Sequence, residues 1–219
     1  VGKPPLPPYI RKARRAADLP EFSDEDIERY NTIFGDEAGS VAAPTASLHF
    51  TDDLLARLDA LGVQRVPVTL HIGLGTFMPV RVDDLAEHDM HEEWIDVPAP
   101  TIAALRAARA EGRRIIAVGT TVVRTLESLP DPLPEPGQGV QTSTNLFITP
   151  PDPDTGEGGF DFRFTDLLMT NFHLPRSTLI ALVAALPNVG IDRLKAWYAE
   201  AIAQQYRFYS YGDAMLLAP

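Results

Sequence analysis

Several stretches of this sequence combine Gly, Thr, His and Asp in ways that the packing of a core does not require. Each sets polar side chains beside glycines or prolines at the edge of an apolar run, where a scaffold presents loop residues to a ligand. An enzyme is therefore the first hypothesis. The stretches are GSVAAPTASLHF (39–50), VTLHIGLGTF (68–77), AVGTTVVRTLES (117–128), TNFHLPRSTL (170–179) and YRFYSYGDAML (206–216).

His71 lies in an apolar run that leads into a glycine turn. Gly73 and Gly75, followed by Thr76, would let a ligand approach the backbone closely, with the imidazole pointing into a cleft. The turn is neither a dinucleotide-binding loop nor a Walker loop, because it lacks a third glycine and Pro79 follows where a helix should begin. The alternative is a core histidine whose hydrogen bonds are satisfied beside a tight turn.

Gly119, Thr120 and Thr121 follow a predicted buried strand and begin a predicted helix. The first backbone N–H groups of a helix are unpaired and favour an anion or a carboxylate. Arg124 lies one turn further along and could hold the same anion. The alternative is a threonine that only caps the helix.

Two later segments carry further candidates. Asn171 and His173 are predicted to lie in a loop before a buried helix, where polar side chains indicate ligand contacts. Tyr211 and Asp213 belong to a short aromatic segment near the C-terminus, which could form an aromatic cleft. The alternatives are a local turn network for the first pair and packing in the core for the aromatic side chains.

The histidines at 88 and 91 suggest a metal site at first sight. A zinc-binding helix has two histidines at a spacing of four with a glutamate between them, whereas the spacing here is three. We therefore predict no metal site, and we expect His91 or a nearby carboxylate to act as an acid or a base.

The composition narrows the function classes. A chain of 219 residues that is 45% hydrophobic can bury a sizeable core, and the absence of cysteine excludes disulfides and a thiolate nucleophile. No stretch approaches the roughly 20 apolar residues of a membrane span, so a soluble, cytoplasmic protein without a membrane partner is expected. The net charge of −11 argues against a broadly basic nucleic-acid face but leaves room for a local one.

The pattern of elements predicts an α/β fold. Residues 1–22 are predicted to be a proline-rich linker and basic segment, and residues 23–219 a mixed, layered α/β domain in which 130–160 is a long loop region. Helices are expected over 51–61, 100–112, 177–186 and 192–206, and two further helices are expected to begin near residues 23 and 120. The expected strands are 66–72, 115–118, 146–149 and 160–164.

Taken together, these segments resemble the S-adenosylmethionine:tRNA ribosyltransferase-isomerase family of queuosine biosynthesis. The resemblance covers nearly the whole chain, apart from roughly residues 130–160. It is carried by PLPPYI (5–10), VAAPTASLHF (41–50), TLHIGLGTF (69–77), MHEE (90–93), AVGTTVVRTLES (117–128), TNFHLPRSTL (170–179) and YRFYSYGDAM (206–215).

The resemblance implies an α/β domain together with a β-barrel domain that is largely absent from this chain, so that an N-terminal part would be missing. It implies transfer and isomerisation of the ribosyl part of S-adenosylmethionine onto 7-aminomethyl-7-deazaguanine in tRNA. Epoxyqueuosine-tRNA, adenine and methionine would be the products. S-adenosylmethionine is then a substrate, and no metal or redox cofactor is implied.

The chemistry that the resemblance implies needs a base, a proton donor, and contacts for a carboxylate and for adenine or ribose. Gly73, Gly75 and Thr76 would allow close approach of the substrate. The remaining candidates are His71 or His49 as the base, Asp213 or His91 for proton transfer, Thr120, Thr121 and Arg124 for the anion, and Asn171, His173 and Tyr211 for adenine or ribose.

Some positions depart from the family pattern. Met78 stands where an arginine often follows Gly-Thr-Phe, and Ser47 stands where a glycine is usual. Phosphate contacts depend on Arg and Lys, so a small-molecule acceptor in place of tRNA is one alternative. A non-catalytic relative that only binds S-adenosylmethionine is another.

Overall fold

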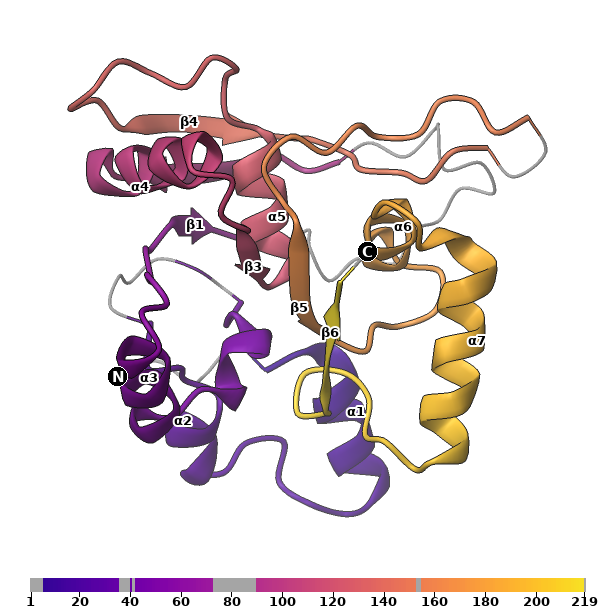
Figure 1. Ribbon diagram of the computed structural model, residues 1–219. Helices are drawn as coiled ribbons and strands as arrows, with labels where there is room; N and C mark the ends of the chain where they lie inside the picture. Colours follow the sequence, from indigo (N-terminus) through magenta and orange to yellow (C-terminus); the bar gives the residue numbers. More distant parts are fainter. Residues whose placement is uncertain (1–5, 36–39, 41, 73–89, 153–154, 219) are drawn as a thin grey trace.

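Strands in the described part of the chain form two three-stranded sheets with interspersed helices (Figure 1). The computed structural model describes residues 6–35, 40, 42–72, 90–152 and 155–218. The first sheet has the antiparallel order β1 (Thr69–His71), β2 (Glu93–Val97), β4 (Val140–Thr144). The second has the order β3 (Ile116–Val118), β5 (Leu167–Asn171), β6 (Ala214–Leu217), with β3 parallel and β6 antiparallel to β5. The mixed α/β class that the sequence predicts is confirmed.

Two helices begin at capping residues that the sequence shows. Thr51 accepts a hydrogen bond from the Leu54 N–H at the start of one helix, and Ser177 accepts one from Ile180 at the start of another. The helical elements are α1 (Pro8–Ala16), α2 (Glu25–Arg29), the 3₁₀ helix η1 (Thr45–His49), α3 (Asp52–Ala60), α4 (Ala99–Ala110), α5 (Thr120–Glu127), α6 (Thr178–Ala185) and α7 (Gly190–Ala203).

The main core lies between the second sheet and helices α4, α5, α6 and α7. Figure 1 shows β5 at the centre, with β6 beside it and α6 and α7 to the right. Val123 of α5, Leu168 of β5 and Leu182 of α6 are buried within one cluster, to which Ile102 of α4 and Leu194 of α7 also belong. Burial of each such side chain contributes about 1.5–3 kcal/mol. This core fixes the end of β5 and the start of α5 relative to each other.

The N-terminal segment differs from the expected extended linker. Residues 8–16 form α1, because a proline fits the first turn of a helix, where its missing N–H is not needed. Arg14 of α1 donates two hydrogen bonds to Asp26 of α2, at 2.6 and 2.7 Å. Asp26 is 1% exposed, and the Arg14 guanidinium lowers the pKa of its carboxyl to about 2. This ion pair therefore holds α1 against α2.

Three strand predictions need correction. The strand expected over 66–72 is limited to β1, and those expected over 146–149 and 160–164 are not strands. The sequence pattern also missed β2, β4, β5 and β6, and Asn171, expected in a loop, is the last residue of β5. The expected 130–160 loop thus contains β4, and its residue Ile148 is 1% exposed in the core.

Glu127 explains why residues 160–164 are not a strand. Its buried carboxylate accepts hydrogen bonds from the backbone N–H groups of Arg163 (2.8 Å), Phe164 (3.2 Å) and Thr165 (2.9 Å). These donors are therefore satisfied by a side chain rather than by a neighbouring strand. The strand begins only at Leu167.

Candidate active site

A cavity of about 470 Å³ lies where the end of β5 and the start of α5 meet the loops around them. Residues that line it come from the start of α1, the segment that leads into η1, and the loop before β6. Its volume falls within the roughly 300–1,000 Å³ typical of small-molecule sites. We call it the main cavity.

The N-terminus of α5 forms one wall of the main cavity. Gly119 precedes the helix with a φ of 100°, a conformation that residues other than glycine rarely adopt. Its N–H donates to the Met169 carbonyl of β5 at 2.8 Å, which fixes the turn to the sheet. No side chain caps this helix within the described residues, and Thr120 and Thr121 line the cavity. The free N–H groups of the first turn would favour an anionic group there.

Arg124 lines the same wall and is almost fully buried. Its Nη1 lies 3.0 Å from Oε2 of Glu93 on β2, and the two side chains are 5% and 3% exposed. The Arg124 Nε and Nη2 atoms are buried and have no hydrogen-bond partner within the described part of the chain. Unsatisfied guanidinium donors at a cavity wall are costly unless a ligand accepts from them.

Asn171 ends β5 at the floor of the main cavity and is 3% exposed. Its Oδ1 accepts a hydrogen bond from the Thr45 hydroxyl at 3.0 Å, and its Nδ2 lies 3.4 Å from Nε2 of His49. The structure therefore brings together His49 and Asn171, two predicted site residues that are far apart in sequence. Thr45 was not predicted individually, although the run at 39–50 that contains it was.

His173 lines the main cavity two residues beyond β5. Its Nε2 lies 3.0 Å from the Thr170 hydroxyl, and its backbone N–H donates to the Tyr198 hydroxyl at 2.9 Å. Burial lowers the pKa of His173 to about 4. The imidazole is therefore neutral near pH 7, and it can accept or donate a hydrogen bond without carrying charge.

Tyrosines that the sequence analysis did not single out form the opposite wall. The Tyr9 hydroxyl donates to Ser210 Oγ at 2.6 Å and accepts from the Ser210 N–H at 2.9 Å. The Tyr9 ring packs edge-on against Tyr209 at 5.3 Å between centroids, and Tyr30 also lines the cavity. Burial raises the pKa of Tyr9 and of Tyr30, so both phenols stay protonated near pH 7. The PLPPYI motif, which contains Tyr9, was the available signal.

Other predicted residues lie away from the main cavity. His71 packs against Trp94 at 5.0 Å between ring centroids on β1 and β2, and His91 is exposed; neither is among the lining residues. Asp213 is held by Arg207, whose side chain and backbone N–H donate to it at 2.8 and 2.7 Å. These hydrogen bonds lower the pKa of Asp213. The predicted Gly73, Gly75 and Thr76 lie outside the described residues.

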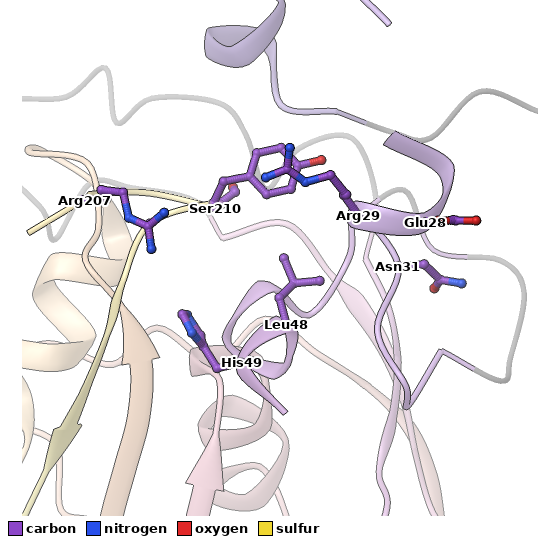
Figure 2. Close-up of a pocket in the computed structure, with 9 residues that line it drawn as sticks. Glu28, Arg29, Asn31, Leu48, His49, Arg207 and Ser210 are labelled. Atoms are coloured by element: carbon purple, nitrogen blue, oxygen red, sulfur yellow. The ribbon is translucent and has the colours of Figure 1, made fainter. Parts of the chain in front are cut away.

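A second cavity of about 300 Å³ (Figure 2) shares the lining residue Ser210 with the main cavity. Tyr211, a predicted site residue, lines it together with His49. The Tyr211 ring packs edge-on against Tyr30, with 5.6 Å between the centroids. His49 and Tyr211 therefore line the second cavity, and neither is among the residues that line the main cavity.

Metal ligands and membrane spans were sought in the described ranges. No group of three or more His, Cys, Asp or Glu side chains there could hold a metal ion. None of the helices in those ranges has the length and apolar character needed to cross a membrane.

Comparison with known proteins assigns the family. The model of the family described as "Queuosine biosynthesis protein" matches residues 1–217. The S-adenosylmethionine:tRNA ribosyltransferase-isomerase of Maricaulis maris is 51% identical over 99% of this chain and 57% of its own length. The protein of that name from Acaryochloris marina is 50% identical over 100% of this chain and 53% of its own.

A solved structure is similar to this chain in both sequence and fold. The S-adenosylmethionine tRNA ribosyltransferase of Thermotoga maritima aligns with a TM-score of 0.61 and 44% identity, over 78% of this chain and 50% of that one. The chain thus spans a little over half the length of the curated relatives it matches. With a family match over nearly every residue and about half of the positions identical, the chain belongs to the queuosine biosynthesis protein family.

Proposed function

We propose that this chain is the S-adenosylmethionine-binding part of an S-adenosylmethionine:tRNA ribosyltransferase-isomerase. The enzyme would transfer and isomerise the ribosyl moiety to 7-aminomethyl-7-deazaguanine in tRNA, giving epoxyqueuosine-tRNA, adenine and methionine. S-adenosylmethionine and tRNA would be its substrates, with no further cofactor, and the cytoplasm would be its location.

One observation carries the proposal: the uncapped N-terminus of α5 and the unsatisfied donors of Arg124 line the same wall of the main cavity. S-adenosylmethionine ends in an α-carboxylate, and such a group would accept hydrogen bonds from both sources. The 3.0 Å contact with Glu93 orients the guanidinium and leaves its Nε and Nη2 for the ligand.

The rest of the main cavity suits the nucleoside end of the same molecule. Tyr9 and Tyr209 offer aromatic surface for adenine or for the sulfonium cation, which aromatic rings attract. The neutral His173 supplies a hydrogen bond without bringing a second positive charge near the sulfonium. Asn171 would contact the ribose or adenine.

The reaction also needs a base that removes a proton made acidic by the neighbouring sulfonium. His49 is the candidate that the geometry favours, because its contact with Asn171 connects it to the floor of the main cavity. His71 remains the alternative base, and Asp213 and His91 remain candidates for proton transfer.

The test is release of adenine and methionine from S-adenosylmethionine by the natural, full-length protein. The assay compares tRNA that carries 7-aminomethyl-7-deazaguanine with the same tRNA carrying guanine at that position. Release only with the modified tRNA is expected. No release with either tRNA, but release with free 7-aminomethyl-7-deazaguanine, would instead support a small-molecule acceptor. Calorimetric binding of S-adenosylmethionine without any release would support a non-catalytic relative.

His49→Asn and His71→Asn, compared in this assay, separate the two candidate bases. The variant that lacks the true base should release adenine at least about a hundredfold more slowly, while its affinity for S-adenosylmethionine stays within a few fold of that of the unaltered protein. Equal rates in both variants and the unaltered protein would refute both assignments.

A further inference from the structure

The second cavity is smaller than the main cavity and has two arginines among its lining residues. Its walls are the end of α2, the end of η1 and the loop before β6. Figure 2 shows Arg207 and Arg29 extending from opposite sides toward the same space, with His49 and Leu48 below them. The cavity's volume of about 300 Å³ lies at the lower end of the range for ligand sites, which suits a group no larger than one nucleotide.

Both arginines keep donors available. The Arg29 and Arg207 side chains are 68% and 75% exposed. Arg29 lies over the Tyr211 ring, with its Cζ 5.5 Å from the centroid, and its carboxylate neighbour Glu25 is 3.9 Å away, beyond hydrogen-bond distance. Arg207 uses Nη2 and its backbone N–H for Asp213. A guanidinium has five N–H donors, so each side chain can also bind a phosphate.

Carboxylates lie close to both arginines: Asp213 contacts Arg207, and Glu25 lies near Arg29. Glu28 lines the rim, but Figure 2 shows its carboxylate pointing away from Arg207 and His49. Asp213 accepts from Arg207 and thereby holds that guanidinium in place. The two guanidinium groups therefore converge on one cavity, and each keeps N–H donors beyond those that face its carboxylate neighbour.

The two cavities are neighbours. Ser210 lines both of them, and Tyr30 and Tyr209 of the main cavity are each adjacent in sequence to a residue of the second one. His49 of the second cavity contacts Asn171 of the main cavity. A molecule that spans both would therefore place one group beside the proposed S-adenosylmethionine site and the next group between the arginines.

We propose that the second cavity holds a nucleotide of the tRNA that neighbours the modified base, with its phosphate bound by Arg29 and Arg207. This inference rests on the proposed function and adds the surface that receives the RNA. The planar guanidinium matches the geometry of a phosphate, and loop nucleotides can unstack to enter a cavity. The site would position the RNA, while sequence would be read elsewhere.

The experiment measures binding of the modified tRNA to the natural, full-length protein at several salt concentrations. The variants are Arg29→Gln, Arg207→Gln and the double variant. Arg57→Gln is the matched control, because Arg57 is an exposed arginine on α3 that lines neither cavity. Affinity for S-adenosylmethionine is measured in parallel and also reports that the variants are folded.

The double variant should bind tRNA about tenfold more weakly, and Arg29→Gln alone should show part of that loss without disturbing Asp213. The slope of log affinity against log salt should fall by about 0.7, because the two arginines bind one phosphate and each phosphate neutralised on single-stranded RNA contributes about 0.7. The affinity for S-adenosylmethionine should not change.

Other outcomes overturn the inference. Unchanged tRNA affinity and salt slope in the double variant, or an equal loss in Arg57→Gln, would refute it while leaving the proposed function intact. Absence of tRNA binding by the unaltered protein would refute both. An equal loss of affinity for S-adenosylmethionine would show that the arginines act on the main cavity instead.

Discussion

Arg124 should have two separable roles, one in stability and one in ligand binding. Its guanidinium lies 3.0 Å from the Glu93 carboxylate, and both side chains are at most 5% exposed. Removing one member of a buried ion pair typically costs 3–5 kcal/mol, because the remaining charge stays buried without its partner. We therefore expect Arg124→Met to lower the free energy of unfolding by about 3 kcal/mol.

The double variant Arg124→Met, Glu93→Gln removes both charges and should recover about 2 kcal/mol of that loss. Binding should not recover. Hydrogen bonds to a charged group contribute about 1.5–3 kcal/mol, so the affinity for S-adenosylmethionine should fall about ten- to hundredfold in both variants. The second substitution thus restores the fold but not the proposed carboxylate contact.

The assays are urea unfolding and calorimetric titration with S-adenosylmethionine, both on the natural, full-length protein. Arg57→Met, on the exposed surface of α3, controls for the loss of an arginine. An affinity in the double variant equal to that of the unaltered protein would show that Arg124 is purely structural. A single variant as stable as the unaltered protein would refute the argument about the buried pair.

Two further predictions concern buried carboxylates. Hydrogen bonds from Arg14 lower the pKa of Asp26 from 3.8 to about 2, so its ionisation stabilises the fold fully above about pH 4 and progressively less as the pH falls toward 2. At pH 7, Asp26→Asn should lower the free energy of unfolding by about 2 kcal/mol. Urea unfolding of the variant and of the unaltered protein should show this difference shrinking toward pH 2. A difference that stays constant with pH would contradict the argument. Glu127→Gln replaces one of the two carboxylate oxygens that accept from the backbone of 163–165 with an NH2 donor, and should lower the free energy of unfolding by about 2 kcal/mol. Amide hydrogen exchange at Phe164 and Thr165 should become faster. Unchanged exchange there would show that the carboxylate does not hold this segment.

The sequence predicted elements whose causes are local. The threonine and serine caps of α3 and α6 are visible in the sequence, and so is the strand, glycine and helix pattern around Gly119. Gly119 in particular combines a required positive φ with the start of α5. The anion site proposed at this helix was therefore accessible from spacing alone.

Elements determined by distant contacts were missed. Strand β2 lies in a charged stretch that resembles a loop, and its Glu93 is buried beside Arg124, which approaches from the distant helix α5. The aromatic residues 160–164 have the composition of a strand, yet Glu127 takes their backbone donors. Thr45 and Tyr9 lie in runs that the sequence analysis quoted, but their contacts with Asn171 and Ser210 join distant positions that a local pattern does not pair.

The hydrogen bonds between Tyr9 and Ser210 join residues 201 positions apart. During synthesis the N-terminal part emerges from the ribosome first. Tyr9 can therefore form its hydrogen bonds with Ser210 only after nearly the whole of this sequence has been synthesised. Contacts between such distant positions form slowly, because closing so long a loop costs entropy before the contact forms. This part of the wall of the main cavity is thus completed only once Ser210, which follows β5 and α7 in the chain, has been synthesised.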